Sequence, residues 1–135
     1  MRKYLIAAHG TLASGIRSSL EIIIGSLENI FIIDAYVGEN QSLEDEIALV
    51  LSHIKDDDDF IVFTDLMGGS VTNQILQHAL KKNVYIISGF NLPLLLDILL
   101  ADPATPVNEV IDTGIKNAKD QIVYINNLLT TDKNQ

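Results

Sequence analysis

Short apolar runs that alternate with segments of helical periodicity constrain the fold of this chain more than any other feature. Each run is rich in β-branched or aromatic residues, which is typical of strands buried on both faces. Strands and helices that alternate with short connections predict a mostly parallel sheet covered by helices on both faces, a three-layer α/β sandwich. The predicted strands are 4–8, 29–37, 60–64 and 83–88, and the helices between them are 12–24, 43–54 and 72–82.

The connections restrict the order of these strands. Right-handed crossovers leave few topologies, and we expect the flavodoxin-like order 2-1-3-4. Further along the chain, Pro93 is predicted to begin a helix and residues 107–118 to form the last one. We predict that residues 121–126 form a fifth strand, antiparallel at an edge of the sheet. We expect residues 1–129 to form a single domain and residues 130–135 a polar tail.

The composition argues against several classes of function. Eighteen acidic and nine basic residues give the 135-residue chain a formal net charge of −9, so we expect no nucleic-acid partner, because phosphate backbones attract Lys and Arg. The chain has no cysteine for a disulfide or a thiolate metal site, and we predict no metal and no cofactor. No apolar run has the length of a membrane span, so we expect a cytoplasmic protein without direct membrane insertion. The four acids at 56–59 are interpreted as a solvated turn.

Two chemically useful side chains follow neighbouring strands of the predicted sheet. Open α/β sheets bind ligands beyond the carboxyl ends of their strands, where the strand order reverses, and here that crevice lies between strands 1 and 3. Strand 1 ends at His9 and strand 3 ends at Asp65. Because neighbouring strands lie about 4.8 Å apart, we expect the imidazole and the carboxylate to meet across the crevice.

An imidazole beside a carboxylate is suited to nucleophilic chemistry. The carboxylate fixes the tautomer, raises the basicity of the ring and stabilises charge that develops on it. Backbone N–H groups at two helix starts are expected to bind a phosphoryl group held by His9. The alternative is a structural histidine at a strand end, and we interpret His53 and His78 as surface or helix-end residues. The candidate phosphoryl-binding residues are Gly10, Thr11, Gly68, Gly69 and Ser70.

Four motifs lie in order along the chain: His9-Gly10-x-Leu12-Ala13-x-Gly15, Gly38-Glu39-Asn40, Asp65-x-x-Gly68-Gly69-Ser70-x-x-Asn73 and Gly89-x-Asn91-x-Pro93. Together they resemble the IIA component of the mannose/fructose/sorbose family of sugar phosphotransferase systems (PTS). Each motif alone is weak evidence, but four in register across one short domain are specific. The resemblance extends to about Ile125. One departure is Val71, where the family commonly has proline after the Gly-Gly-Ser turn.

The resemblance implies a fold, an activity and a set of partners. It implies a phosphotransferase, the phosphocarrier of a phosphoenolpyruvate-dependent sugar PTS, with a phosphohistidine at His9. Asp65 would then hydrogen-bond the ring nitrogen that carries no phosphorus, and Ser70 would contact the phosphoryl group. Phospho-HPr would be the donor, and the IIB component would be the acceptor that serves sugar uptake and phosphorylation. The family is usually dimeric, often through exchange of the last strand, for which residues 121–126 are the candidate.

Two alternatives share much of this pattern. The phosphotransfer subunit of a dihydroxyacetone kinase system resembles the same fold, but it tends to have Ser after the nucleophilic histidine, where this chain has Gly10. A non-transferring regulatory module could carry every motif. A response-regulator receiver is excluded because strand 1 ends without the acids that would hold Mg²⁺. A flavin carrier would need aromatic residues around the ring, and the chain has no Trp.

Overall fold

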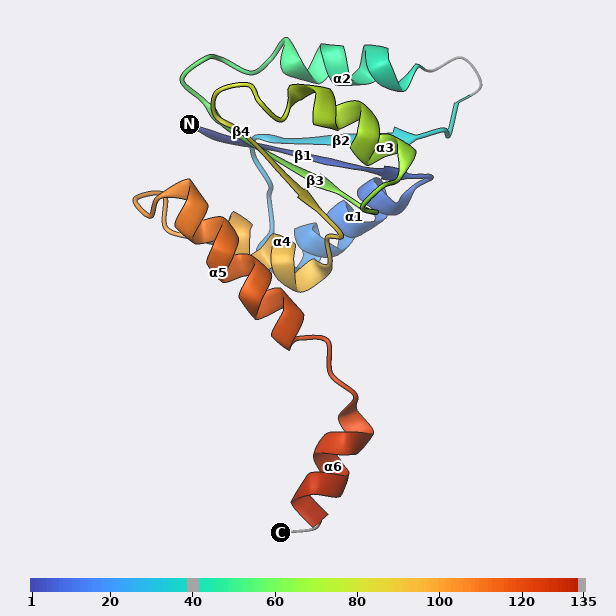
Figure 1. Ribbon diagram of the computed structural model, residues 1–135, viewed down its shortest axis with the longest axis vertical. Coiled ribbons are helices and arrows are strands. Elements are labelled where there is room, and N and C mark those ends of the chain that lie inside the picture. Colours follow the sequence, from blue (N-terminus) through green and yellow to red (C-terminus); the bar gives the residue numbers. More distant parts are fainter. Residues whose placement is uncertain (39–41, 134–135) are drawn as a thin grey trace. The chain divides into compact units, whose positions relative to one another are not determined.

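The computed structural model describes residues 1–38 and 42–133, and its contacts divide the chain into two compact units (Figure 1). The first unit ends at Leu92 and the second begins at Pro93. Of the Gly38-Glu39-Asn40 motif, Glu39 and Asn40 lie outside the described residues, as do Asn134 and Gln135 of the predicted tail.

The first unit is built on a sheet of four parallel strands in the order β2-β1-β3-β4, as predicted. The central strands are almost continuously buried, since helices cover both of their faces. The register pairs His9 with Ala35 of β2, and Ala7 with Thr64 of β3. The carboxyl ends of three neighbouring strands therefore lie at one edge of the sheet. The strands are β1 (Arg2–His9), β2 (Ile30–Ala35), β3 (Asp59–Thr64) and β4 (Val84–Ser88).

Helices on opposite faces of this sheet complete three layers (Figure 1). Helix α1 (Leu12–Ile24) covers one face, and α2 (Leu43–Leu51) lies with α3 (Ser70–Ile75) on the other. The Ser42 hydroxyl accepts a hydrogen bond from the Asp45 N–H (3.3 Å), the cap predicted for α2. The core between α2, α3 and the sheet is apolar, and it fixes the positions of the strand ends. Its fully buried members include Ala7, Ala35, Val62 and Val71.

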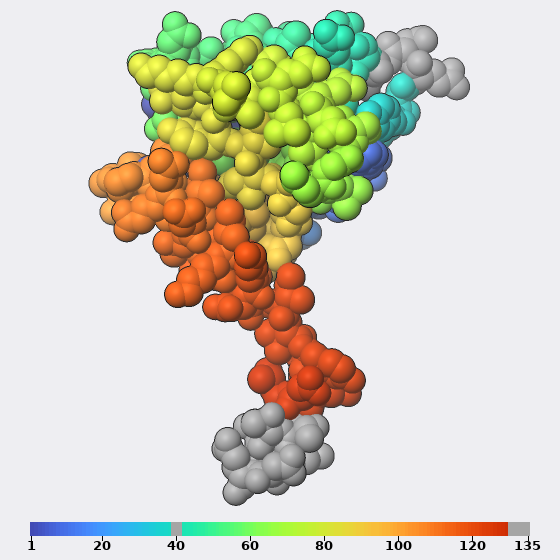
Figure 2. All heavy atoms as spheres, in the orientation of Figure 1, coloured from blue at the N-terminus to red at the C-terminus, as the bar shows by residue number. Residues whose placement is uncertain are grey.

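The helix after β3 is shorter than predicted and begins earlier. It starts at Ser70 and ends at Ile75, and a 3₁₀ turn follows over Leu76–His78. The Thr72 and Thr64 hydroxyls are hydrogen-bonded to each other (2.8 Å), which connects the first turn of α3 to the end of β3. Val71 is fully buried in the core. Helix α3 and the 3₁₀ turn form part of the surface of the first unit that Figure 2 shows, where they are coloured yellow-green.

The second unit corrects the prediction of a fifth strand. Residues 121–126 form no strand: Gln121 follows α5, residues 122–124 have no regular structure, and α6 begins at Ile125. A strand forms only where its backbone pairs with a sheet edge, and within the described residues this segment pairs with neither edge strand, β2 or β4. The apolar run at 122–125 does not specify whether the strand that it would pair with belongs to the same chain. The helices are α4 (Leu92–Leu99), α5 (Val107–Asp120) and α6 (Ile125–Lys133).

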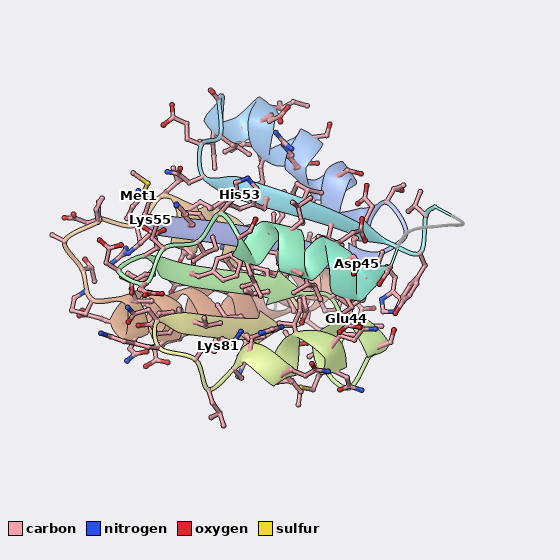
Figure 3. All side chains as sticks on the ribbon, turned by 90° about the horizontal axis from the view of Figure 1, so that it is seen from above. Met1, Glu44, Asp45, His53, Lys55 and Lys81 are labelled. Carbon is pink, nitrogen blue, oxygen red and sulfur yellow. The ribbon has the colours of Figure 1, made fainter. Side chains whose placement is uncertain are left out.

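The acidic turn before β3 also differs from its interpretation, because Asp58 is buried rather than solvated. Its carboxylate accepts hydrogen bonds from the Lys3 ammonium (2.7 Å) and from the Lys55 N–H (2.8 Å). These hydrogen bonds lower the pKa of Asp58 to about 2. Figure 3 places Lys55 and His53 near Met1, at the end of the sheet opposite to Glu44 and Asp45. The turn is thus part of the fold at the amino ends of the strands, away from the crevice.

None of the helices in the described ranges is both long and apolar enough to cross a membrane.

Candidate functional site

The predicted pair of side chains meets at the carboxyl edge of the sheet. One carboxylate oxygen of Asp65, Oδ2, accepts a hydrogen bond from the His9 backbone N–H at 2.9 Å. The same oxygen lies 2.8 Å from the ring nitrogen Nδ1 of His9. The register explains this geometry: Thr64 pairs with Ala7, so Asp65, one residue later, lies level with the end of β1. The two contacts fix both the backbone and the ring of His9.

The pair also fixes which nitrogen of the ring is available. Burial alone would raise the pKa of Asp65, but hydrogen bonds from the His9 backbone N–H and from the ring outweigh it, and the pKa lies below its usual value. An ionised carboxylate can only accept hydrogen bonds. The shared hydrogen therefore belongs to Nδ1, and the neutral ring presents a lone pair at Nε2. The side chain of His9 is 39% exposed, whereas that of Asp65 is 9% exposed, so the imidazole faces solvent and the carboxylate does not.

The loop after β3 brings two more predicted residues to the ring. The Ser70 Oγ lies 3.4 Å from His9 Nε2. Gly69 passes so close that a Cβ there would lie 3.5 Å from His9 Cε1 and 3.3 Å from the Cβ of Leu66. Gly68 has a φ of +77°, which favours glycine in this turn. The loop therefore closes against the imidazole and places a hydroxyl beside its free nitrogen.

Gly10 and Thr11 follow His9 directly, and their backbones make hydrogen bonds within the fold. Gly10, with a φ of +60°, turns the chain out of β1, and its N–H donates to the Ala35 carbonyl (2.9 Å). A phosphoryl group could use that N–H only if this hydrogen bond opened. Thr11 is the N-cap residue of α1, and its carbonyl accepts from the Gly15 N–H (2.9 Å). A contact between Thr11 and a phosphoryl group stays a prediction.

Tyr36, which sequence reasoning missed, also belongs to this cluster. It follows the last residue of β2, its hydroxyl donates a hydrogen bond to Ser70 Oγ (2.8 Å), and its ring centroid lies 5.6 Å from that of His9. Strand β2 neighbours β1, so the residue after β2 reaches the same edge as His9. That topological signal was present in the predicted strand order, but the predicted strand ran past this position to residue 37.

The other two histidines lie at helix ends. His53 lies beyond the end of α2, where its Nδ1 is 3.0 Å from the Leu49 carbonyl oxygen (Figure 3). His78 ends the 3₁₀ turn, and burial, with a smaller contribution from the charge of Lys81, lowers its pKa. Within the described parts of the chain, no three His, Asp or Glu side chains gather as a metal site would need.

Comparison with known proteins gives one consistent picture. Residues 3–115 match the family model described as the PTS system fructose IIA component. The mannose-specific EIIAB component of Escherichia coli K12 is 26% identical over 121 residues, which cover 87% of this chain and 38% of that protein. The chain thus spans well under half the length of the curated relatives it matches.

Two solved structures are also similar. A protein from Klebsiella pneumoniae, described provisionally as a permease of the phosphoenolpyruvate-dependent sugar phosphotransferase system, has a TM-score of 0.90 at 32% identity; the match covers 95% of this chain and 93% of that one. The EIIA phosphotransferase component of Streptococcus agalactiae has a TM-score of 0.79 at 29% identity, with 94% and 99% covered.

Proposed function

Because this chain belongs to the mannose-type IIA family of sugar phosphotransferase systems, we propose that it is a phosphocarrier that holds a phosphoryl group on Nε2 of His9. The match over residues 3–115 confirms the family that the four motifs indicate. One observation carries the proposal: Asp65 occupies Nδ1 of the ring, which leaves Nε2 as the exposed nucleophile.

Within this chain, the proposed transfer uses only side chains at the site, His9 and Asp65. The lone pair of Nε2 attacks the phosphorus of the donor, a new N–P bond forms, and the bond from phosphorus to the donor breaks with its electron pair leaving on the donor. The ring of His9 becomes positively charged while it keeps its hydrogen on Nδ1. The ionised Asp65, 2.8 Å away, stabilises that charge. Transfer to the acceptor reverses these steps, which suits a carrier.

We propose phospho-HPr as the donor and the IIB component as the acceptor, in the cytoplasm. The relatives named mannose-specific EIIAB support an acceptor of the IIB type. Several large apolar side chains are exposed in the segments that directly follow the strands at the site. They include Tyr36 (55% exposed) after β2, and Leu66 (58%) and Met67 (81%) in the loop after β3. Exposed apolar side chains around a reactive group suit transient docking of a protein.

A reconstituted relay tests this function. Incubation with phosphoenolpyruvate, enzyme I and HPr is expected to add one acid-labile phosphoryl group, seen as an increase in intact mass. Addition of a IIB protein should then remove it and label the IIB. Omission of HPr is the matched control and should leave the chain unmodified. A chain that stays unmodified with every component present would instead be a non-transferring regulatory module.

We also propose that the chain is a homodimer. The segment after α5 carries a run of exposed apolar side chains, with Ile122 at 78%, Tyr124 at 67% and Ile125 at 65% exposure. A second copy of the chain would bury this surface. Sedimentation at micromolar concentration is expected to give the mass of two chains, and replacement of Ile122 and Tyr124 by Ser should shift it to one. Sedimentation of the native chain as a monomer would refute the dimer.

A further inference from the structure

Tyr36 lies in a hydrogen-bonded series that ends at the nucleophile. Its hydroxyl donates to Ser70 Oγ at 2.8 Å, and that oxygen lies 3.4 Å from His9 Nε2. The rings of Tyr36 and His9 are tilted by 45° with centroids 5.6 Å apart, within the range of a favourable ring contact. Two independent contacts, one to the ring and one through Ser70, thus connect Tyr36 to His9.

The backbone at Tyr36 is unusual. Its φ is +66°, in the left-handed region, which is uncommon for a residue other than glycine and especially so for a bulky one. The preceding residue, Ala35, is fully buried and its carbonyl accepts from the Gly10 N–H, so the end of β2 is fixed against the turn after β1. Unfavourable backbone conformations of this kind persist where the surroundings hold them, and they cluster at functional sites.

The hydrogen-bond inventory of Ser70 shows what Tyr36 does for it. A serine hydroxyl has one hydrogen to donate and lone pairs that accept. Because Tyr36 donates to Ser70 Oγ, one lone pair is occupied and the oxygen is held in place, while the serine hydrogen remains to be donated. The neighbouring group at 3.4 Å is His9 Nε2, a lone-pair acceptor in the neutral ring. Once Nε2 is phosphorylated, the phosphoryl oxygens are the acceptors in that place.

We propose that Tyr36 is a positioning residue of the phosphoryl site, which holds Ser70 so that the serine hydroxyl donates to the phosphoryl group on His9. The proposal rests on the proposed phosphocarrier function and deepens it. Tyr36 keeps its own hydrogen throughout, and it acts through Ser70 rather than on the phosphorus. Nothing in the four motifs includes this residue, since the second of them begins at Gly38.

The test is a double-mutant cycle of phosphoryl transfer from phospho-HPr, measured in single turnovers at several donor concentrations. Tyr36→Phe keeps the ring and removes the hydroxyl, and it should lower the maximal rate about three- to tenfold with little change in the half-saturating donor concentration. In a Ser70→Ala background, the same substitution should have almost no further effect, because its route to the phosphoryl group is already lost. Tyr85→Phe on β4 is the matched control and should leave transfer unchanged.

Each outcome either supports the proposal or refutes it. A maximal rate equal to that of the native chain would overturn it, and so would a Tyr36→Phe effect that persists in full without the Ser70 hydroxyl. A change confined to the half-saturating concentration would make Tyr36 a docking contact instead. Melting temperatures of the variants verify that all are folded. If the native chain accepts no phosphoryl group at all, the proposed function itself fails, which is a different result from a normal Tyr36→Phe variant.

Discussion

The His9→Gln variant is expected to accept no phosphoryl group under conditions that modify the native chain completely. The amide of glutamine has no lone pair on nitrogen that can attack phosphorus, so the N–P bond cannot form. His9 is 39% exposed at the end of β1, so the substitution should leave the core and the fold intact. Intact mass after incubation with phosphoenolpyruvate, enzyme I and HPr measures the result.

The other two histidines of the chain provide matched controls. His53→Gln removes the imidazole that follows α2, and His78→Gln removes the imidazole at the end of the 3₁₀ turn. Both variants should be phosphorylated to the same extent as the native chain. Phosphorylation of His9→Gln, or its loss in either control, would place the nucleophile elsewhere.

The Asp65→Ala variant is expected to transfer phosphate about ten- to a hundredfold more slowly than the native chain. It loses a charge-assisted hydrogen bond, which contributes about 1.5–3 kcal/mol. The loss is larger for the transition state than for the ground state, because the positive charge on the ring develops during transfer. The ring also loses the acceptor that holds its hydrogen on Nδ1. Single-turnover rates with phospho-HPr are the measurement.

Two further variants separate the charge of Asp65 from its shape. Asp65→Asn can still accept hydrogen bonds through its amide oxygen, so its rate should lie between those of Asp65→Ala and the native chain. Asp57→Ala, in the exposed part of the acidic turn, should have no effect. The pKa of Asp65 is lowered by its hydrogen bonds from His9, so its carboxylate should stay ionised to a lower pH than that of an ordinary aspartate. An unchanged rate in Asp65→Ala would refute the role of this carboxylate.

The strand order and the pairing of His9 with Asp65 could be predicted because both follow from local patterns. Each strand is a short apolar run, and the crossover rules then leave few topologies, of which the order 2-1-3-4 is the one expected. A residue at the end of each central strand must lie at the same edge, whatever the details of the loops. The position of Ser70 followed from its place in a motif, and the structure brings its oxygen to 3.4 Å from Nε2.

The place of Tyr36 at the site, the burial of Asp58 and the absence of a fifth strand were missed for different physical reasons. The left-handed φ of Tyr36 is imposed by its surroundings and contradicts the preference of a bulky residue. The burial of Asp58 depends on Lys3, which is distant in sequence, so a run of acids gave no sign of it. Residues 121–126 have a strand-like composition, but a strand forms only where its backbone pairs with a sheet edge, and in the described residues this segment pairs with neither β2 nor β4.

The most direct test of the central claim is to identify the ring nitrogen that carries phosphorus. Nuclear magnetic resonance of the phosphorylated chain, with ¹⁵N in its histidine rings, distinguishes the two nitrogens by their coupling to ³¹P. Because Asp65 holds Nδ1, phosphorus is expected on Nε2 of His9 while Nδ1 keeps its hydrogen. Phosphorus on Nδ1 of His9, or on any other residue, would contradict the account.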